Sequence, residues 1–282
     1  MKQIFRLDIV AQEGDFDRIS GLLTLGVSFG WEEESLATGE TRFRVHCEQE
    51  DFLQKLRESV SRAAPETHCT LEALEAQDWL SAWRQFFTPV CCGSRFVVLP
   101  PWLAESPDFP GRTPVLIEPK SAFGTGHHAT TALCLGVVSD LLDQGRIASG
   151  QTFLDLGTGS GVLGIACCKS GLSGLGLDID PLAVDNALEN RELNQVSGFD
   201  AALGGIEAAV GRSFDLVLAN ILARPLMELA PAVAAARKPH GCLVLSGLLE
   251  IQADDVEAAY KAQGLPTARR VIEGEWCALV WE

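Results

Sequence analysis

The most regular pattern in the chain is an alternation of short apolar runs with helical segments from residue 128 onward. Runs such as Leu216-Val217-Leu218-Ala219 are typical of strands buried on both faces of a parallel sheet. Strands that alternate with helices predict a sheet covered on both sides. We expect strands at 152–156, 175–178, 214–219, 242–246, 268–272 and 276–281, and helices at 129–142, 162–169, 181–194, 225–237 and 254–263. The predicted fold class is α/β, with a doubly wound, mostly parallel, seven-stranded Rossmann-like sheet within 101–282.

Residues 1–75 show a different order of elements. Strand-like segments cover 3–9, 27–33, 41–47 and 67–74, and helical spacing covers 14–25 and 49–63. The order β-α-β-β-α-β predicts a small α+β domain with the ferredoxin-like arrangement. The segment contains no cofactor loop and no cluster of catalytic residues. We expect it to hold a partner as a substrate-recognition domain, with a purely structural cap as the alternative.

Between the two predicted domains, residues 76–100 form an expected helical linker. Its aromatic residues follow helical spacing and are Trp79, Trp83, Phe86 and Phe87. We interpret this stripe as packing between domains rather than as a surface for a ligand. Two short strands, at 95–99 and 113–117, are expected before the main domain.

A glycine-rich turn follows the predicted strand at 152–156 and has the sequence Asp155-Leu156-Gly157-Thr158-Gly159-Ser160-Gly161. Glycine permits positive φ and lets a ligand approach the main chain, so Gly157 and Gly159 are expected to contact a cofactor. Free amides at the start of the next helix face the same ligand. Asp178 ends the following apolar run, where a carboxylate accepts hydrogen bonds from a ribose diol. These features predict a nucleoside-binding βαβ unit.

The glycine spacing favours one class of cofactor. Nicotinamide and flavin sites usually carry G-x-G-x-x-G, with a pyrophosphate on the helix amides, whereas this turn carries G-x-G-x-G. Asp155 would repel a pyrophosphate but suits a ligand with an ammonium and a sulfonium, such as S-adenosylmethionine. Asp155 has an alternative role as a cap for the amides of the turn. A nicotinamide-dependent dehydrogenase and a binding module without turnover are the alternative functions.

Asn220 follows the buried strand at 214–219, at the sheet edge where ligands bind in open α/β folds. Its amide offers both a donor and an acceptor for the methionine part of the cofactor or for the incoming nucleophile. The alternative is an N-cap for the helix after Ala223. No aromatic residue follows in Ile221-Leu222-Ala223, which favours a tetrahedral amine over a flat base or amide as the methyl acceptor.

A second glycine-rich segment, Phe123-Gly124-Thr125-Gly126-His127-His128, leads into the helix predicted at 129–142. Amides and hydroxyls at such a helix start bind carboxylates, and Thr131 is placed to bind the carboxylate of the cofactor. Adjacent histidines diverge, and no acidic or cysteine partner lies at ligand spacing, so no metal site is expected. A histidine here could accept the proton of an amine, although solvent would serve as well.

The composition restricts partners and location. The net charge of −16 argues against direct binding of nucleic acid. An acidic surface steers a basic partner towards it, or else provides only solubility. No apolar run approaches the ~18 residues of a membrane span, and the N-terminus does not resemble a signal peptide. Nine cysteines without a C-x-x-C motif indicate buried thiols in a reducing cytoplasm.

At its motifs the chain resembles a known family, the methyltransferases of large-subunit ribosomal protein eleven. The resembling segments are Gln77-Asp78-Trp79 with Trp83, Ala122-Phe123-Gly124-Thr125-Gly126, Thr130-Thr131, the glycine turn, Asp178-Ile179-Asp180-Pro181, Asn220-Ile221-Leu222 and Gly274-Glu275-Trp276. This resemblance implies a class I, S-adenosylmethionine-dependent enzyme that methylates lysine side chains and the α-amine of that basic ribosomal protein. It also implies substrate capture by the N-terminal domain and cofactor contacts at Thr131, Gly157, Asp178 and Asn220.

We therefore expect a cytoplasmic, monomeric protein N-methyltransferase with Asn220 as its catalytic residue. The methyl group would pass in line from sulfonium to a neutral amine, with positioning and exclusion of water supplying most of the rate. The alternative substrates are a lysine of another protein or a small amine.

Overall fold

The computed structural model describes residues 4–27, 31–36, 38–47, 49–65, 67–74, 88–105, 108–118 and 128–282. The chain forms two compact units, Met1–Phe86 and Phe87–Glu282. The aromatic stripe predicted around Trp79 and Trp83 lies outside the described residues, and so does the segment from Phe123 to His127.

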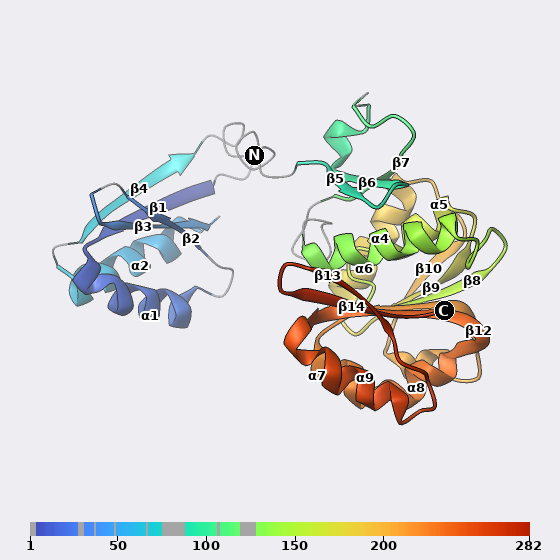
Figure 1. The fold of residues 1–282 in the computed structure, drawn as a ribbon. Coiled ribbons are helices and arrows are strands. Elements are labelled where there is room, and N and C mark those ends of the chain that lie inside the picture. The colour runs from blue at the N-terminus through green and yellow to red at the C-terminus, as the bar shows by residue number, and fades with distance from the viewer. Residues whose placement is uncertain are drawn as a thin grey trace. The chain divides into compact units, whose positions relative to one another are not determined.

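The first unit has the ferredoxin-like arrangement that its sequence predicts (Figure 1). Its antiparallel sheet has the strand order β2-β3-β1-β4. The elements are β1 (Ile4–Ala11), η1 (Glu13–Asp15), α1 (Phe16–Gly26), β2 (Glu32–Ser35), β3 (Thr41–Cys47), α2 (Glu50–Ala63) and β4 (His68–Leu74). Alternate residues of β1 and β3, among them Leu7, Ile9 and Phe43, are fully buried in the core with the helices. They share one face because strand side chains alternate between the two faces.

The opposite face of this sheet carries paired charges. The carboxylate of Asp8 lies between Arg6 and Arg44, with its oxygens 2.6 Å and 3.0 Å from their Nε atoms. Arg44 also contacts Glu34 at 3.0 Å, and Arg6 contacts Glu72 at 2.9 Å. This face therefore presents charges of both signs, each held in place by a neighbour.

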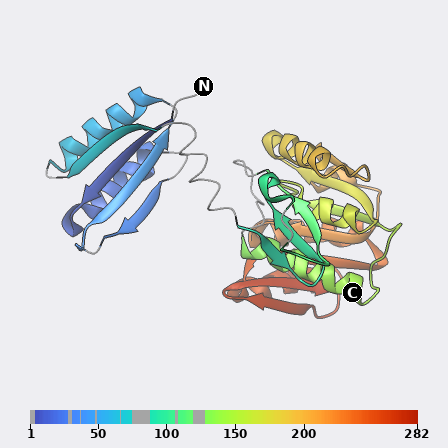
Figure 2. The same cartoon turned by 90° about the horizontal axis from the view of Figure 1, so that it is seen from above.

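Part of the predicted linker belongs to a small sheet. Strands β5 (Val90–Cys92), β6 (Phe96–Leu99) and β7 (Thr113–Leu116) form it, and they lie beside helix α4 (Ala129–Asp143) (Figure 2). The strands predicted at 95–99 and 113–117 are confirmed by β6 and β7, whereas β5 lies where the linker was expected to be helical. All four residues of β6 are buried and two of them are β-branched valines, which favour a strand.

The second unit is built on a seven-stranded sheet with the order β10-β9-β8-β11-β12-β14-β13. Its strands are β8 (Thr152–Leu156), β9 (Ser173–Asp178), β10 (Phe199–Leu203), β11 (Phe214–Asn220), β12 (Arg237–Leu249), β13 (Arg269–Glu273) and β14 (Trp276–Trp281). Neighbours pair in parallel except at β14, which is antiparallel to both β12 and β13. The strand order reverses between β8 and β11, which is where open α/β sheets bind ligands.

Helices cover both faces of this sheet, as predicted (Figure 1). One core contains residues of α4, α5 (Val162–Lys169) and α6 (Pro181–Leu193), and the other contains residues of α7 (Ala223–Glu228), α8 (Ala230–Ala236) and α9 (Ala253–Lys261). Short 3-10 turns are η2 (Pro101–Leu103), η3 (Ile206–Ala209) and η4 (Glu250–Gln252). Helix α6 begins as expected, with proline at its first position and the Asp180 carboxylate accepting the amide of Leu182 at 2.9 Å.

Three features of this sheet and its helices differ from the sequence prediction. Strand β10 was not predicted, because it is an edge strand in which only Phe199 is buried. The helix predicted over 225–237 is divided at Leu229, with Pro231 in the first turn of α8, and strand β12 begins at Arg237 rather than at 242.

Candidate functional site

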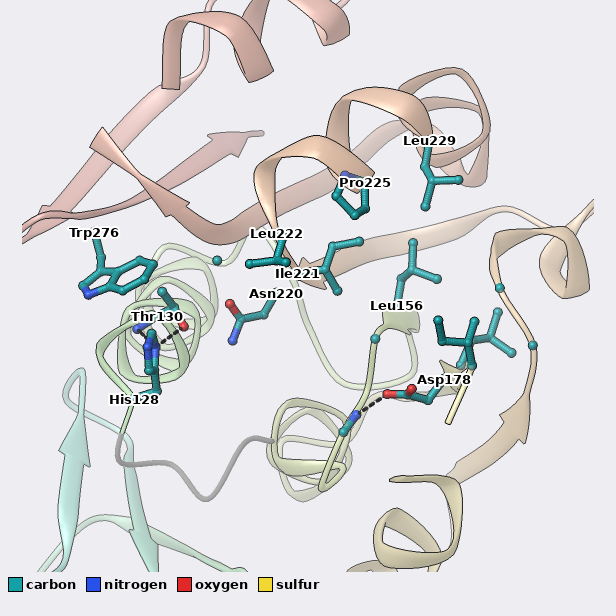
Figure 3. Close-up of a pocket in the computed structure, with 17 residues that line it drawn as sticks. His128, Thr130, Leu156, Asp178, Asn220, Ile221, Leu222, Pro225, Leu229 and Trp276 are labelled. Carbon is teal, nitrogen blue, oxygen red and sulfur yellow. Dashed lines mark hydrogen bonds between the residues drawn. The ribbon is translucent and has the colours of Figure 1, made fainter. Parts of the chain in front are cut away.

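A pocket of about 570 Å³ lies at the carboxyl ends of β8, β9 and β11 in the second unit (Figure 3). Glycines and apolar side chains make up most of its wall. Its described lining residues are His128, Thr130, Leu156, Gly157, Gly159, Leu177, Asp178, Ile179, Gly204, Gly205, Asn220, Ile221, Leu222, Pro225, Leu229, Gly247 and Trp276. The pocket therefore stands where the strand order reverses, as the sequence predicts.

The glycine turn adopts the left-handed conformation expected of it. Gly157, Gly159 and Gly161 have φ values of +72°, +54° and +81°. The amide of Gly157 donates to the carbonyl of Leu177 at 2.8 Å, which ties the turn to β9. A Cβ added to Gly157 would lie 2.3 Å from Cγ2 of Ile221, so the turn packs directly on the residue that follows Asn220.

Asp178 lies in the pocket at the end of β9 and supports the glycine turn. Its Oδ2 accepts the amide of Gly159 at 2.9 Å, and its Oδ1 accepts the amide of Asp180 at 3.0 Å. Each carboxylate oxygen has a second lone pair. The geometry therefore leaves acceptor capacity for a diol in the pocket, which is the role that the sequence predicts for this side chain.

Asp155 does not reach the pocket. It is fully buried, and its Oδ2 accepts the hydroxyl of Thr158 at 2.6 Å and the amide of Gly164 at 3.2 Å. Burial raises the pKa of this carboxyl to about 6. The interpretation of Asp155 as a group facing the ligand is wrong. The alternative, a cap for the amides of the turn, is close to the structure, but the amide that Asp155 accepts belongs to Gly164 of α5 and its contact in the turn is the Thr158 hydroxyl.

Asn220 is held by Thr131 rather than used as a helix cap. Its Nδ2 donates to Oγ1 of Thr131 at 3.4 Å, while its Oδ1 is buried and has no hydrogen-bond partner among the described residues. The residue before α7 is Leu222, so the alternative of Asn220 as an N-cap is wrong. Thr131 itself is 1% exposed and does not line the pocket, so it lies behind Asn220.

The start of α4 closes one end of the pocket. Nδ1 of His128 accepts the amide of Thr130 at 3.4 Å and lies 2.7 Å from the Thr130 hydroxyl. When Nδ1 accepts from Thr130 in this way, the proton of a neutral ring lies on Nε2. The His128 ring packs edge-on against Trp276 with centroids 4.7 Å apart.

Sequence reasoning missed the apolar part of the wall. Ile179 and Leu222 are 82% and 72% exposed beside the pocket, and Gly204 and Gly205 follow the unpredicted strand β10. Trp276 had a sequence signal, the Gly274-Glu275-Trp276 motif, but the motif alone does not place the indole against His128.

The sheet order, with β14 alone antiparallel, and the nucleoside-type pocket at the switch point define the class I methyltransferase fold. A crystal structure of ribosomal protein L11 methylase from Lactobacillus delbrueckii subsp. bulgaricus is similar, with a TM-score of 0.62 and 28% identity, covering 69% of this chain and 97% of that one. A family model, ribosomal protein L11 methyltransferase (PrmA), matches residues 29–282. The chain belongs to this ribosomal protein L11 methyltransferase family.

Relatives with the same name match most of the chain. The protein from Chloroflexus aurantiacus is 41% identical over 233 residues, which are 73% of this chain and 69% of that protein. The protein from Pelobacter propionicus is 35% identical over 280 residues, which are 98% of this chain and 86% of that protein. Across the described residues, no helix is both long enough and apolar enough to span a membrane.

Proposed function

We propose that this methyltransferase transfers methyl groups from S-adenosylmethionine to amino groups of ribosomal protein L11, namely lysine side chains and the α-amine. The family to which the chain belongs supports the substrate and the cofactor. The structural observation that carries the amine as acceptor is the Asn220 side chain in the pocket wall. Its Nδ2 is engaged by Thr131, and its buried Oδ1 has no partner.

The pocket fits the cofactor. We assign Asp178 to the ribose diol, the main chain of Gly157 and Gly159 to the amino-acid part, and Asn220 to the reacting end. Thr131 then acts on the cofactor site through Asn220. An unpaired acceptor such as Oδ1 of Asn220 costs free energy when it stays buried, so a bound N–H group would remove a penalty of about 1–3 kcal/mol.

Catalysis by the residues of this chain consists of orienting and desolvating the amine. Lysine has an ordinary pKa near ~10.4, and apolar surroundings such as Ile221 and Leu222 favour its neutral form. Oδ1 of Asn220 accepts an N–H of that amine and directs its lone pair. S-adenosylmethionine, when bound, would supply an activated methyl group on sulfur. The neutral amine held by Asn220 would form the N–C bond as the C–S bond breaks with its electron pair going to sulfur, and the resulting ammonium would lose a proton to solvent.

The first unit, in this proposal, holds the protein substrate. Its open sheet face presents fixed charges such as Asp8 between Arg6 and Arg44, which suits recognition of a polar protein surface. The overall charge of −16 favours a basic protein over nucleic acid. We further propose that the protein acts as a monomer in the cytoplasm, where ribosomal proteins are made.

Transfer to purified L11 tests the function directly. The full chain, labelled S-adenosylmethionine and L11 should give L11 species heavier by whole methyl groups, and a small amine offered at the same concentration should stay unmodified. Removal of residues 1–86 should abolish transfer to L11 while cofactor binding, measured by calorimetry, is kept. Methylation of the small amine but not of L11 would contradict the proposal.

A further inference from the structure

The indole of Trp276 forms part of the pocket wall at the end where Asn220 lies. Trp276 begins β14, pairs with Glu273 of β13 and with Leu249 of β12, and is half-buried. At the far end of the same strand, Trp281 is 2% exposed and its Nε1 donates to the carbonyl of Pro266. Trp281 is thus a core residue, whereas Trp276 offers its ring surface to the pocket and to His128 (Figure 3).

The charged groups of the pocket lie elsewhere. Among the described lining residues, Asp178 is the sole acid, and it holds the amides of Gly159 and Asp180 at the glycine turn. Neither lysine nor arginine occurs in the described lining. Within the part of the wall that the structure describes, an amine beside Asn220 therefore meets an amide oxygen, apolar side chains and the aromatic rings of Trp276 and His128, and no carboxylate forms an ion pair with it there.

This composition matters because methylation changes the acceptor nitrogen. Each transfer replaces an N–H by a methyl group, so a carboxylate or amide that binds through N–H loses a partner at every step. An aromatic face attracts a positive charge without needing an N–H, and it attracts methylated ammonium groups in particular. A carboxylate would also favour the protonated amine and so oppose the next transfer.

We propose that Trp276 determines which amines the site accepts and how many methyl groups they receive, because its indole face contacts the acceptor nitrogen and the methyl groups already on it. The inference rests on the proposed function, since it concerns the acceptor end of the same pocket. Trp276 contacts the substrate, while His128 positions the indole by packing against its ring.

The surface around Trp276 supports a cationic acceptor. Glu250, Glu273 and Glu275 are exposed, and the amide of Glu250 donates to the carbonyl of Glu275 at 2.8 Å, which brings η4 beside the β13–β14 turn. Three exposed carboxylates at this turn raise the local concentration of a protonated side chain. These acids therefore attract a protonated amine towards the strand that carries Trp276, and the indole then contacts the amine without an ion pair.

The experiment compares the full chain with Trp276→Phe and Trp276→Leu, and uses Ile272→Ala on the neighbouring strand, outside the pocket lining, as the matched control. Intact mass spectra of L11 give the number of methyl groups added. We expect Trp276→Leu to lower kcat/KM for L11 about tenfold and to shift products towards fewer methyl groups. The kcat/KM and the number of methyl groups of Trp276→Phe should lie between those of wild type and Trp276→Leu. The cofactor Kd should stay within about twofold of wild type in all variants.

A binding arm tests the aromatic contact without turnover. Two peptides are titrated in the presence of S-adenosylhomocysteine, one with trimethyl-lysine and one with its neutral isostere, in which carbon replaces the charged nitrogen. Wild type should prefer the cation about threefold to thirtyfold, and Trp276→Leu should bind both alike. Equal binding by wild type overturns the inference, and so does a Leu variant that keeps both the preference and the number of methyl groups. If wild type discriminates between the peptides but methylates no L11, the substrate proposal fails and the aromatic subsite stands.

Discussion

Nδ2 of Asn220 donates to Oγ1 of Thr131 at 3.4 Å, and this contact joins the end of β11 to the first turn of α4 across 89 residues of sequence. In this arrangement the amide donor of Asn220 faces the buried hydroxyl, and its acceptor Oδ1 has no hydrogen-bond partner among the described residues. We therefore propose that Thr131, which is not among the described lining residues, positions Asn220.

Thr131→Val should lower kcat for L11 methylation about threefold to tenfold, because the Asn220 amide loses the acceptor that fixes its orientation. Thr131→Ser keeps the hydroxyl and should retain most of the activity. A double-mutant cycle with Asn220→Ala measures the coupling between the two residues. Strictly additive effects on kcat/KM would show that Thr131 acts on something other than Asn220.

Asp178→Asn should weaken cofactor binding by at least about tenfold while the protein stays folded, because charge-assisted hydrogen bonds to a diol and to two amides become neutral ones or are lost. Calorimetry with S-adenosylmethionine measures the change in Kd. Asp185→Asn is the matched control. Asp185 is exposed on α6 outside the pocket lining, so this substitution removes the same charge without touching the site. An unchanged Kd in Asp178→Asn would sink the assignment of the diol site.

Sequence patterns predicted the parts of this fold and site that depend on local chemistry. Glycines in the turn have the positive φ that the motif requires, and Asp178 ends β9 as expected because both features are encoded within a few residues. Strand β10 was missed because an edge strand buries little, and its only buried residue is Phe199.

Long-range contacts set the limit of prediction. Asp155 lies two residues before Gly157, yet whether its carboxylate faces a ligand or the interior depends on Thr158 and Gly164. The packing of Trp276 on His128 needs the position of β14 between β12 and β13, which no local pattern specifies. The helical prediction for the linker failed at β5 for the same reason, since this three-residue strand is defined by its pairing with β6 and its packing on α4.

Gly157→Ala should abolish cofactor binding and lower stability. A Cβ there lies 2.3 Å from Cγ2 of Ile221, and the φ of +72° is unfavourable for alanine. Gly211→Ala separates the two causes, because Gly211 has a φ of +80° but no atom within 4 Å of an added Cβ. We expect a loss of about 1 kcal/mol in the Gly211 variant and a larger loss in the Gly157 variant.

A second substitution identifies the clash. Ile221→Ala in the Gly157→Ala background removes Cγ2 and should restore part of the stability. The loss that remains should be the cost of alanine at a positive φ, which Gly211→Ala measures separately. Thermal unfolding of the single and double variants gives the comparison. No recovery in the double variant would show that the strain in Gly157→Ala arises from φ alone.

Asp155→Asn should change how stability depends on pH. The folded-state pKa of about 6 lies above the ordinary value of 3.8, so the folded state holds this proton more tightly than the unfolded state does. The contribution of Asp155 is therefore greatest below pH 4 and is lost as pH rises to about 6, by up to about 3 kcal/mol.

The variant lacks this titration, so the free energy of unfolding of wild type should fall relative to Asp155→Asn between pH 4 and pH 6. Denaturant unfolding at several pH values measures the difference. The test is how the difference in unfolding free energy changes with pH. Its absolute size is not the test, because the amide that Asp155→Asn introduces also places an N–H where the unpaired Oδ1 of Asp155 now lies, which changes stability at every pH. A constant difference across this range would mean that Asp155 is not the titrating group.

Glu257 on α9 provides the opposite pH dependence. Its side chain is 3% exposed and is bound by Arg270 of β13, by Lys261 at 2.8 Å and by the amide of Ala268 at 3.2 Å. The hydrogen bond from Arg270 is the largest cause that lowers the pKa of this carboxyl, from 4.5 to about 2. Its stabilising contribution is therefore fully present above pH 4.5 and is lost as pH falls towards 2.

Glu257→Gln should lower the free energy of unfolding at neutral pH by about 2–3 kcal/mol, since Arg270 loses its buried partner. The deficit should shrink as acid titrates Glu257 in wild type, and the two proteins should converge near pH 2. The matched control is Asp254→Asn, because Asp254 also binds Arg270 at 2.6 Å but its side chain is 88% exposed, so we expect a loss below about 1 kcal/mol. Equal losses in the two variants would show that the charge of Arg270, and not the burial of Glu257, holds α9 against β13.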